Sequence, residues 1–311
     1  MNSQSEPVSL SRHYSPPCSS VTAGRSHRRK HSANLIEMNI KPITDITGRT
    51  DRYNFHSHSE FCDGRAPIAS ISESACKAGF EVWGVTPHSP LCMDSPCNML
   101  RVDVPHYMET MERMKSEYEG RMTLLAGMEI DFMSRDFGPH IDYFLNMPLD
   151  YRIGSVHFVP NQEGVHLDCD GSYDRFARYL HDGYGDDLRY VVEKYFEQVL
   201  TMLELGGFEM LGHFDKIIGN AFSADPTLEE QGWYAALVDD VIRLAKETGV
   251  VVEINTKAIE TRHRFFPAER WWPRLIDAGI PIVINSDCHH PDLTDLGRKE
   301  ALDRMAAYNS I

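Results

Sequence analysis

Short apolar runs alternate with longer amphipathic segments over most of the chain, from residue 53 to residue 308. The apolar runs have the length of buried strands, whereas the segments between them repeat their apolar positions at helical spacing. Seven strands are predicted, at 53–58, 82–88, 123–131, 151–159, 209–215, 250–256 and 281–289. Six helices are predicted, at 66–79, 104–119, 187–205, 228–248, 268–278 and 295–308.

This order of elements predicts an α/β fold. Strands that alternate with helices form parallel sheets, in which each helix crosses from one strand to the next. Seven such units over about 250 residues favour one barrel over two separate domains. A doubly wound open sheet is the alternative, although no GxGxxG follows the first strand, so a dinucleotide-binding version has no support.

The first fifty residues differ from the rest of the chain. Residues 1–33 are rich in Ser, Pro, Arg and His, and residues 1–50 carry a net charge of +4. We expect residues 1–50 to form a disordered basic extension and residues 51–311 to form the barrel domain, with folding beginning near Tyr53. Two alternatives stay open, namely an organelle transit peptide and a translation start at Met38.

Charge and composition exclude several classes of protein. The formal net charge is −15, so residues 51–311 carry −19, and a body this acidic repels nucleic acid backbones. No run of about 18 apolar residues occurs, which argues against a transmembrane helix. Seven scattered Cys without a CxxC pair suggest a reducing, cytoplasmic compartment.

Polar residues mark the places where the predicted strands end. The first strand ends in His56 and His58, which face the same side because they are two residues apart, and the last ends in a similar pair. The carboxyl ends of parallel barrel strands share one face, so these side chains are expected to converge there. Six histidines and three carboxylates are involved: His56, His58, Asp63, His88, Glu129, His157, His213, Asp287 and His289.

Such a cluster predicts a multinuclear metal site. Burying this many ionisable groups without partners costs several kcal/mol for each charge, and divalent cations remove that cost. Imidazole and carboxylate ligands without thiolate suit zinc, iron or manganese better than calcium or magnesium. Three divalent ions against three carboxylates leave a positive site that can hold a phosphate dianion and activate water.

The motifs around these residues resemble those of the PHP (polymerase and histidinol phosphatase) superfamily, and within it the monofunctional histidinol-phosphatase branch. They are NFHSH with FCDG, VTPHSP, AGMEID, DYRIGSVHF, LGHFD and NSDCH, and they span about Tyr53 to Gly297. The resemblance implies a distorted (β/α)7, TIM-like barrel that holds three divalent metal ions at the C-terminal ends of its strands.

The resemblance also implies a role for each of the nine residues. One metal would be held by His56, His58, Glu129 and Asp287, a second by Asp63, His88 and His289, and a third by Glu129, His157 and His213. Glu129 would bridge two metals. Glu129, His88 and Asp287 are therefore the expected catalytic residues, with His88 acting chiefly as a ligand.

The implied reaction is the hydrolysis of L-histidinol phosphate to L-histidinol and phosphate, in histidine biosynthesis. The expected phosphate contacts are Lys216, after LGHFD, and Arg262 or Arg264, whose spacing after EINT departs from the family pattern. Asp168 and Asp170, in a long insertion at 160–186, either hold the cationic end of the substrate or lie in a solvated loop. A phosphoesterase for another small ester or nucleotide and a non-enzymatic barrel are the alternatives, the latter weakened because all nine ligand positions are filled.

Overall fold

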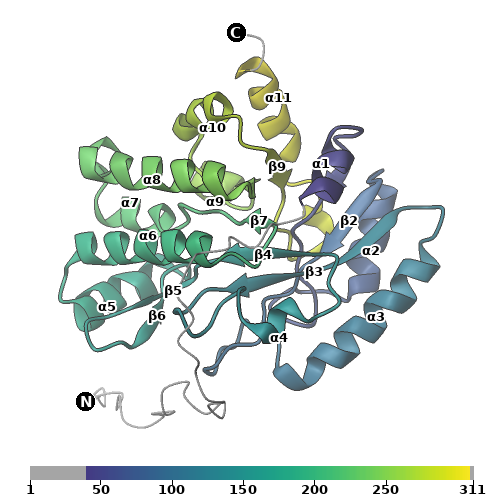
Figure 1. Cartoon of the computed structure of the whole chain (residues 1–311), viewed down its shortest axis with the longest axis horizontal. Coiled ribbons are helices and arrows are strands. Elements are labelled where there is room, and N and C mark those ends of the chain that lie inside the picture. Colours follow the sequence, from purple (N-terminus) through teal and green to yellow (C-terminus); the bar gives the residue numbers. More distant parts are fainter. Residues whose placement is uncertain (1–39, 309–311) are drawn as a thin grey trace, which may run out of the picture.

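The computed structural model describes residues 40–308, which form a barrel of parallel strands surrounded by helices (Figure 1). The strand order is β1-β2-β3-β4-β7-β8-β9, and every neighbouring pair is parallel. All seven predicted strands are confirmed, with these bounds: β1 (Tyr53–Asn54), β2 (Val82–Val85), β3 (Thr123–Asp131), β4 (Tyr151–Ser155), β7 (Met210–Leu211), β8 (Val251–Asn255) and β9 (Ile282–Asn285).

Helices cover the outside of this barrel, and the six predicted helices correspond to α2, α3, α6, α8, α10 and α11. The helices are α1 (Lys41–Thr47), α2 (Ile68–Lys77), α3 (Val104–Glu117), α4 (Asp142–Leu145), α5 (Tyr173–Tyr184), α6 (Leu188–Leu205), α7 (Ile218–Ala224), α8 (Gly232–Thr248), α9 (Ile259–Arg262), α10 (Trp272–Ala278) and α11 (Arg298–Tyr308). Short 3₁₀ turns are η1 (Arg101–Asp103), η2 (Leu228–Glu230), η3 (Glu269–Trp271) and η4 (Pro291–Leu293). No helix among residues 40–308 has the length and apolar character needed to cross a bilayer.

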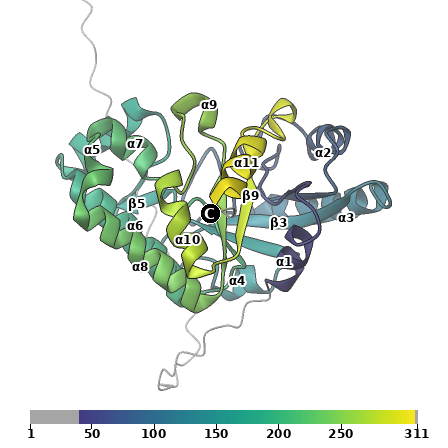
Figure 2. The same ribbon diagram turned by 90° about the horizontal axis from the view of Figure 1, so that it is seen from above.

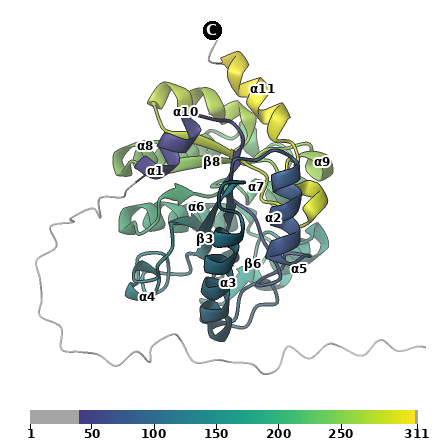
Figure 3. The same ribbon diagram turned by 90° about the vertical axis from the view of Figure 1, so that its right-hand side faces the viewer.

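Two apolar layers attach the helices to the barrel. The larger lies where α6 and α8 pack beside β7 and β8, and it includes Val199, Val241 and Val252. The second lies under α2 and α3, which form the flank opposite α6 and α8 (Figures 2 and 3). Helices α2, α3, α6 and α8 therefore each bury one stripe of side chains, as their sequence periodicity predicts.

The barrel interior is filled by a tyrosine from β4. The hydroxyl of Tyr151 donates to the carbonyl oxygen of Phe55, across the barrel. Two glycines on neighbouring strands leave room for its ring, because a Cβ at Gly84 would lie 1.9 Å from the Tyr151 hydroxyl and one at Gly127 would lie 2.7 Å from Tyr151 Cζ. The centre of the barrel is thus solid, and any site must lie at one of its ends.

The ring closes between β1 and β9, which no regular strand ladder joins. A single parallel bridge links Ser57 to Cys288. Two asparagine side chains supply further bonds, as Asn285 Oδ1 accepts from the Phe55 amide at 2.8 Å and Asn54 Oδ1 accepts from the Ser286 amide at 2.7 Å. We call this junction the seam. Its closure distinguishes the fold from the doubly wound open sheet.

A buried arginine of α11 reinforces the seam from outside. Arg298 donates through Nε to the Ile284 carbonyl at 3.1 Å and through Nη2 to the Asp51 carbonyl at 3.0 Å. Its guanidinium also lies over the rings of Tyr53 and Phe80. The C-terminal helix is thereby fixed to the first strand.

Two segments differ from the sequence predictions. Folding begins earlier than Tyr53, because α1 precedes it and packs Ile43 against the barrel; the expected disorder of residues 1–39 lies outside the described residues. The insertion at 160–186 contains an antiparallel hairpin, β5 (Phe158–Pro160) with β6 (His166–Asp168), followed by α5. The Tyr184 hydroxyl donates to the Val159 carbonyl at 2.7 Å, so the hairpin and α5 form one unit.

Candidate metal centre

All nine predicted ligands lie at the C-terminal ends of the barrel strands. His56 and His58 follow β1, and Asp287 and His289 follow β9, so the seam itself brings four of them together. The others are Asp63 in the loop after β1, His88 after β2, Glu129 within β3, His157 after β4 and His213 after β7. The pairing of β2 with β3 continues to the site, where a bridge joins His88 to Glu129.

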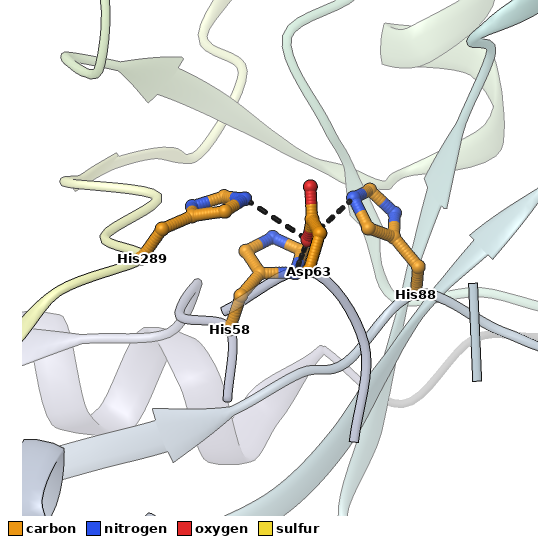
Figure 4. A group of neighbouring side chains, drawn as sticks. All are labelled: His58, Asp63, His88 and His289. Carbon is orange, nitrogen blue, oxygen red and sulfur yellow. Dashed lines mark ion pairs between the residues drawn. The ribbon is translucent and has the colours of Figure 1, made fainter. Parts of the chain in front are cut away.

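One group of side chains surrounds Asp63 (Figure 4). Asp63 Oδ1 lies 3.2 Å from His289 Nε2, 3.7 Å from His88 Nε2 and 3.8 Å from His58 Nδ1. The three imidazoles come from the ends of β9, β2 and β1, and their rings face the carboxylate from different sides. Four donors at these separations form a group that can hold one cation.

Glu129 lies at the centre of the remaining ligands. Its Oε1 is 2.9 Å from His213 Nε2 and 3.5 Å from His157 Nε2, while its Oε2 is 2.9 Å from His88 Nδ1 and 3.2 Å from His56 Nε2. The side chain is fully buried. His58 Nε2 also lies 3.4 Å from Oε2. The two oxygens thus face separate sets of imidazoles, an arrangement that suits a bridging ligand.

Asp287 faces the histidines at the end of β1. Its Oδ1 lies 3.1 Å from His58 Nε2 and 3.7 Å from His56 Nε2. The backbone at Asp287 has φ of 47°, in the left-handed region that residues other than glycine rarely adopt, although Asp tolerates it better than most. Local strain of this kind is held in place by the surrounding structure and is concentrated at functional sites.

Two further carboxylates fix the orientation of the imidazoles, and sequence reasoning did not single them out. Glu253 Oε1 lies 2.7 Å from His56 Nδ1, and Asp131 Oδ1 lies 2.7 Å from His157 Nδ1. Each carboxylate accepts the Nδ1 proton and leaves Nε2 free to face the cluster. Both had a signal in the sequence, because Glu253 interrupts an apolar run and Asp131 follows Glu129 at the same-face spacing of a strand.

The surroundings shift the pKa values of these histidines in opposite directions. Burial and the neighbouring imidazoles hold the pKa of His58 well below its usual value, and burial with Lys216 lowers the pKa of His213 to about 4. Burial also opposes protonation of His157, but the carboxylates of Asp131 and Glu129 outweigh it and raise its pKa to about 9. A neutral imidazole offers a lone pair to a cation, whereas a protonated one must first release its proton, so cation binding at this cluster is coupled to proton release.

The donor atoms fit divalent cations. Asp63 Oδ1, Glu129 Oε2, His88 Nδ1 and His157 Nε2 are buried and make no hydrogen bond to the described residues. Buried polar atoms are almost always paired, so these four indicate a partner of another kind. The ligand atoms form four overlapping groups: His58, Asp63, His88 and His289; His56, His213 and Asp287; His56, His58 and Glu129; and His88, Glu129 and His157. The geometry places His213 in a group with Asp287, whereas the family resemblance assigns His213 to the same metal as His157.

Of the three predicted phosphate contacts, the structure brings only Lys216 to the cluster. Lys216 Nζ is buried, 3.1 Å from Asp170 Oδ2 and 3.6 Å from Asp287 Oδ2. Burial alone would lower the pKa of Lys216, but the surrounding carboxylates, Asp170 first, raise it above its usual value. The ammonium group therefore stays charged inside the site.

Arg262 and Arg264, the other two predicted phosphate contacts, do not lie at the cluster, because both side chains bind other residues. Arg262 donates to the Gly219 carbonyl and to Asn220 Oδ1, and Arg264 makes a bidentate pair with Glu229 at 2.8 and 2.9 Å. A lysine next to the EINT motif lies at the cluster instead. Lys257 Nζ lies 3.1 Å from His289 Nε2 and 3.5 Å from Asp287 Oδ1. The sequence could have indicated this lysine, because it comes immediately after the EINT motif.

A cavity of about 150 Å³ opens over the cluster. Its walls include the ligands Asp63, His88 and His157, and residues of the insertion after β4. The insertion contributes Asp168, Asp170 and Arg175, and Lys257 lies on the wall as well. The cavity thus combines acidic and basic groups beside the candidate metal ligands. Its lining residues are Asp63, His88, Cys97, Asn98, Asp131, His157, Phe158, Asp168, Asp170, Gly171, Arg175 and Lys257.

Comparison with known families agrees with this geometry. Residues 54–257, about two thirds of the chain, match the PHP domain family. The chain belongs to the PHP family. The match includes seven of the nine predicted ligands, from His56 to His213, and the last two follow at the end of β9.

Among named relatives, the "Probable histidinol-phosphatase" of Deinococcus radiodurans is 25% identical over 257 residues, which cover 79% of this chain and 88% of that protein. The "Histidinol-phosphatase" of Bacillus subtilis is 25% identical over 254 residues, covering 75% of this chain and 92% of that protein.

A solved structure has the same fold. The crystal structure of histidinol phosphate phosphatase from Lactococcus lactis, complexed with zinc, L-histidinol and phosphate, aligns with a TM-score of 0.63. It is 17% identical and covers 82% of this chain and 93% of that one. At this level of identity the likeness supports the PHP barrel fold.

Proposed function

We propose that this PHP protein is a phosphoric monoester hydrolase that converts L-histidinol phosphate to L-histidinol and phosphate in histidine biosynthesis. The observation that carries the proposal is the convergence of nine imidazole and carboxylate ligands with a buried lysine beneath one small cavity. Two relatives that align along most of their length are named histidinol-phosphatase, which supports this substrate among phosphate esters.

Three divalent ions, of zinc, iron or manganese, are the proposed cofactors. His56, His58, Glu129 and Asp287 would hold one, Asp63, His88 and His289 a second, and Glu129, His157 and His213 the third. Ions at such a site polarise a phosphate ester and generate a nucleophile from water near neutral pH. The zinc present in the Lactococcus enzyme and the unpaired donor atoms in this chain support divalent ions.

The residues of this chain have distinct tasks around the phosphate. Lys216 and Lys257 supply positive charge beside Asp287, where they can orient phosphate oxygens and stabilise charge that develops on them. Glu129, His88 and Asp287 are the proposed catalytic residues: Glu129 and His88 each belong to two of the ligand groups, and Asp287 faces His56 and His58. His88 also lies on the cavity wall, where it would act chiefly as a ligand.

Charge at the cavity supports a substrate with two unlike ends. L-histidinol phosphate has a dianionic phosphate at one end and an ammonium group beside an imidazole at the other. Lys257 and the ligands Asp63, His88 and His157 line the cavity, as do Asp168 and Asp170 of the insertion. The acidic body of the protein, at −19 for residues 51–311, disfavours long nucleic acids as the substrate. No disulfide joins the six cysteines of the described residues, which is consistent with the proposed cytoplasmic location.

Metal analysis and a substrate panel test the proposal together. The protein is purified without added metal, its metal content is measured, and phosphate release from L-histidinol phosphate is compared with release from nucleoside monophosphates and an aryl phosphate. A carboxylate that binds the substrate ammonium contributes roughly 1.5–3 kcal/mol, so kcat/KM should favour L-histidinol phosphate by about 10- to 150-fold. Equal kcat/KM for a nucleoside monophosphate would instead support a phosphoesterase of wider substrate range.

A further inference from the structure

A short turn between β6 and α5 carries much of the cavity wall. It comprises residues 168–171, and we call it the substrate turn. Asp168 Oδ1 accepts from the amides of Asp170 at 2.8 Å and Gly171 at 3.1 Å, and Asp168 Oδ2 pairs with Arg175 at 3.0 Å. Asp168, Asp170, Gly171 and Arg175 all line the cavity. The shape of this turn therefore decides which charges face the substrate.

One buried amide side chain holds the turn from its outer side. Asn220, from α7, donates through Nδ2 to the Cys169 carbonyl and to the Gly171 carbonyl, both at 2.9 Å. Its Oδ1 accepts from Arg262 Nη2 at 2.9 Å. Helices α5 and α7 lie side by side at this point (Figure 2). The amide is fully buried, and its donors and acceptor are all used, so its orientation is fixed.

Arg262 supports Asn220 and does not itself reach the cavity. One nitrogen of the guanidinium binds Asn220 and the other binds the Gly219 carbonyl, both in α7. Neither Arg262 nor Asn220 contributes to the cavity wall or to the groups of metal ligands. Their hydrogen bonds run from the segment after EINT, through α7, to the substrate turn. The basic residue that the sequence suggests as a phosphate contact thus lies one step behind the substrate-facing residues.

We propose that Asn220 and Arg262 are positioning residues, which hold the substrate turn in the shape that binds the leaving group of the phosphate ester. This inference rests on the proposed phosphatase function and adds to it a determinant of substrate affinity. Two inner bonds complete the attachment, from Lys216 to Asp170 at 3.1 Å and from the Cys169 amide to the His157 carbonyl at 2.9 Å. The inner bonds join the turn to the metal cluster, whereas the outer bonds through Asn220 set its distance from α7.

The substitution Asn220→Asp isolates the outer attachment. It preserves the size of the side chain and its bond to Arg262, but it replaces both donors with an oxygen that repels the two carbonyls. KM for L-histidinol phosphate should rise about tenfold, with kcat within about twofold, because two hydrogen bonds to the turn are lost. Arg262→Gln should raise KM in the same direction by about threefold, since it acts through Asn220. Gln231→Glu, the same amide-to-carboxylate change beside Thr227, is the matched control and should leave KM unchanged.

Two readouts separate positioning from general damage. Metal content should be unchanged in both variants, and amide hydrogen exchange at Asp170 and Gly171 should accelerate about tenfold or more in Asn220→Asp. A fall in kcat at constant KM, a loss of metal, or accelerated exchange without a change in KM would each overturn the proposal. If the wild-type protein prefers another phosphate ester, the proposed function fails on that result alone. The positioning role is then judged by the KM ratio of variant to wild type for the preferred ester.

Discussion

At the scale of single residues, Glu129 is the proposed ligand with the most neighbours in the site. Five imidazoles lie within 3.5 Å of its two oxygens. We predict that Glu129→Ala lowers metal content more than His157→Ala does, because its two oxygens face separate sets of histidines. We also predict a fall in kcat of at least about 10²-fold, since losing even an indirect support of a metal site costs roughly 10- to 100-fold. Elemental analysis and steady-state kinetics on both variants measure these effects, and near-normal turnover at full metal content would refute the bridging role.

The second prediction at this scale concerns Glu253. It is buried in β8 and accepts the proton of His56 Nδ1, so Glu253→Gln removes the negative charge but keeps the size. Metal affinity should fall by roughly 10- to 100-fold, because the orientation and basicity of His56 both weaken. Competition with a chromophoric chelator measures this affinity. Glu247→Gln, on the exposed end of α8, is the control and should have no effect.

Asp215 provides a prediction about pH that does not involve a ligand. Burial raises the pKa of its carboxyl to about 7, although the Ala268 amide donates to it at 2.8 Å. Because the folded pKa lies above the unfolded value of about 4, its stabilising contribution is complete below pH 4 and is lost as pH rises to 7. Asp215→Asn should therefore gain stability relative to wild type between pH 5 and pH 8, by about 1–3 kcal/mol. Urea unfolding at the two pH values checks this, and an unchanged difference would contradict it.

Sequence reasoning picked out the nine side chains that converge in the structure, but it could not place the contacts made by the insertion. A strand end is visible as the point where an apolar run becomes polar, and parallel topology places all such ends on one face. The partners of Asn220 and Lys216 lie in the insertion, at sequence distances that carry no periodic signal. Arg262 and Lys257 are both basic and only five residues apart, so composition cannot tell which one faces the cluster.

At the scale of elements, long apolar periods were predictable and short polar elements were not. The seven strands of the barrel and the helices α2, α3, α6 and α8 bury continuous faces, which leave a clear pattern. The hairpin β5–β6 and α5 bury few residues, among them Phe176 and Tyr184, within a stretch rich in Asp and Gly. Helix α1 buries Ile43 alone, and a single buried residue leaves no periodic pattern from which the helix could be predicted.

The packing of Tyr151 against two glycine-containing strands gives a prediction for β2. A Cβ at Gly84 would lie 1.9 Å from the Tyr151 hydroxyl and 3.1 Å from Phe55 Cα, so Gly84→Ala should cost about 1–3 kcal/mol of unfolding free energy. Removing the hydroxyl with Tyr151→Phe in the same chain should restore part of the loss. Gly232→Ala meets open space at the start of α8 and should be neutral or stabilising. Denaturant titrations of these variants provide the test. If the changes in unfolding free energy caused by Gly84→Ala and Tyr151→Phe simply add in the double variant, the Cβ does not clash with the hydroxyl and the prediction is wrong.

At the scale of the whole molecule, the proposed metals connect every part of the barrel. Their ligands come from β3 and from the loops after β1, β2, β4, β7 and β9, so removal of the ions should affect global stability and not one loop alone. We predict about three metals per chain and a lower melting temperature after chelation, since a ligand at 100 times its Kd contributes about 2.7 kcal/mol. Calorimetry before and after chelation, with elemental analysis, measures both. One metal or none in folded, undialysed protein would refute the trinuclear proposal.

The seam has a consequence for how this protein is made. The rings of His58 and His289 lie with their centroids 4.1 Å apart across it, yet the two residues are separated by more than 200 residues of chain. A ribosome adds about 5–20 residues per second, so His58 emerges roughly 10–50 seconds before its partner is synthesised. During that interval β1 has no neighbour on the seam side, and His56 and His58 lack the carboxylate of Asp287. The nascent chain therefore cannot assemble the complete set of proposed ligands, so we expect full metal binding only after β9 has been synthesised.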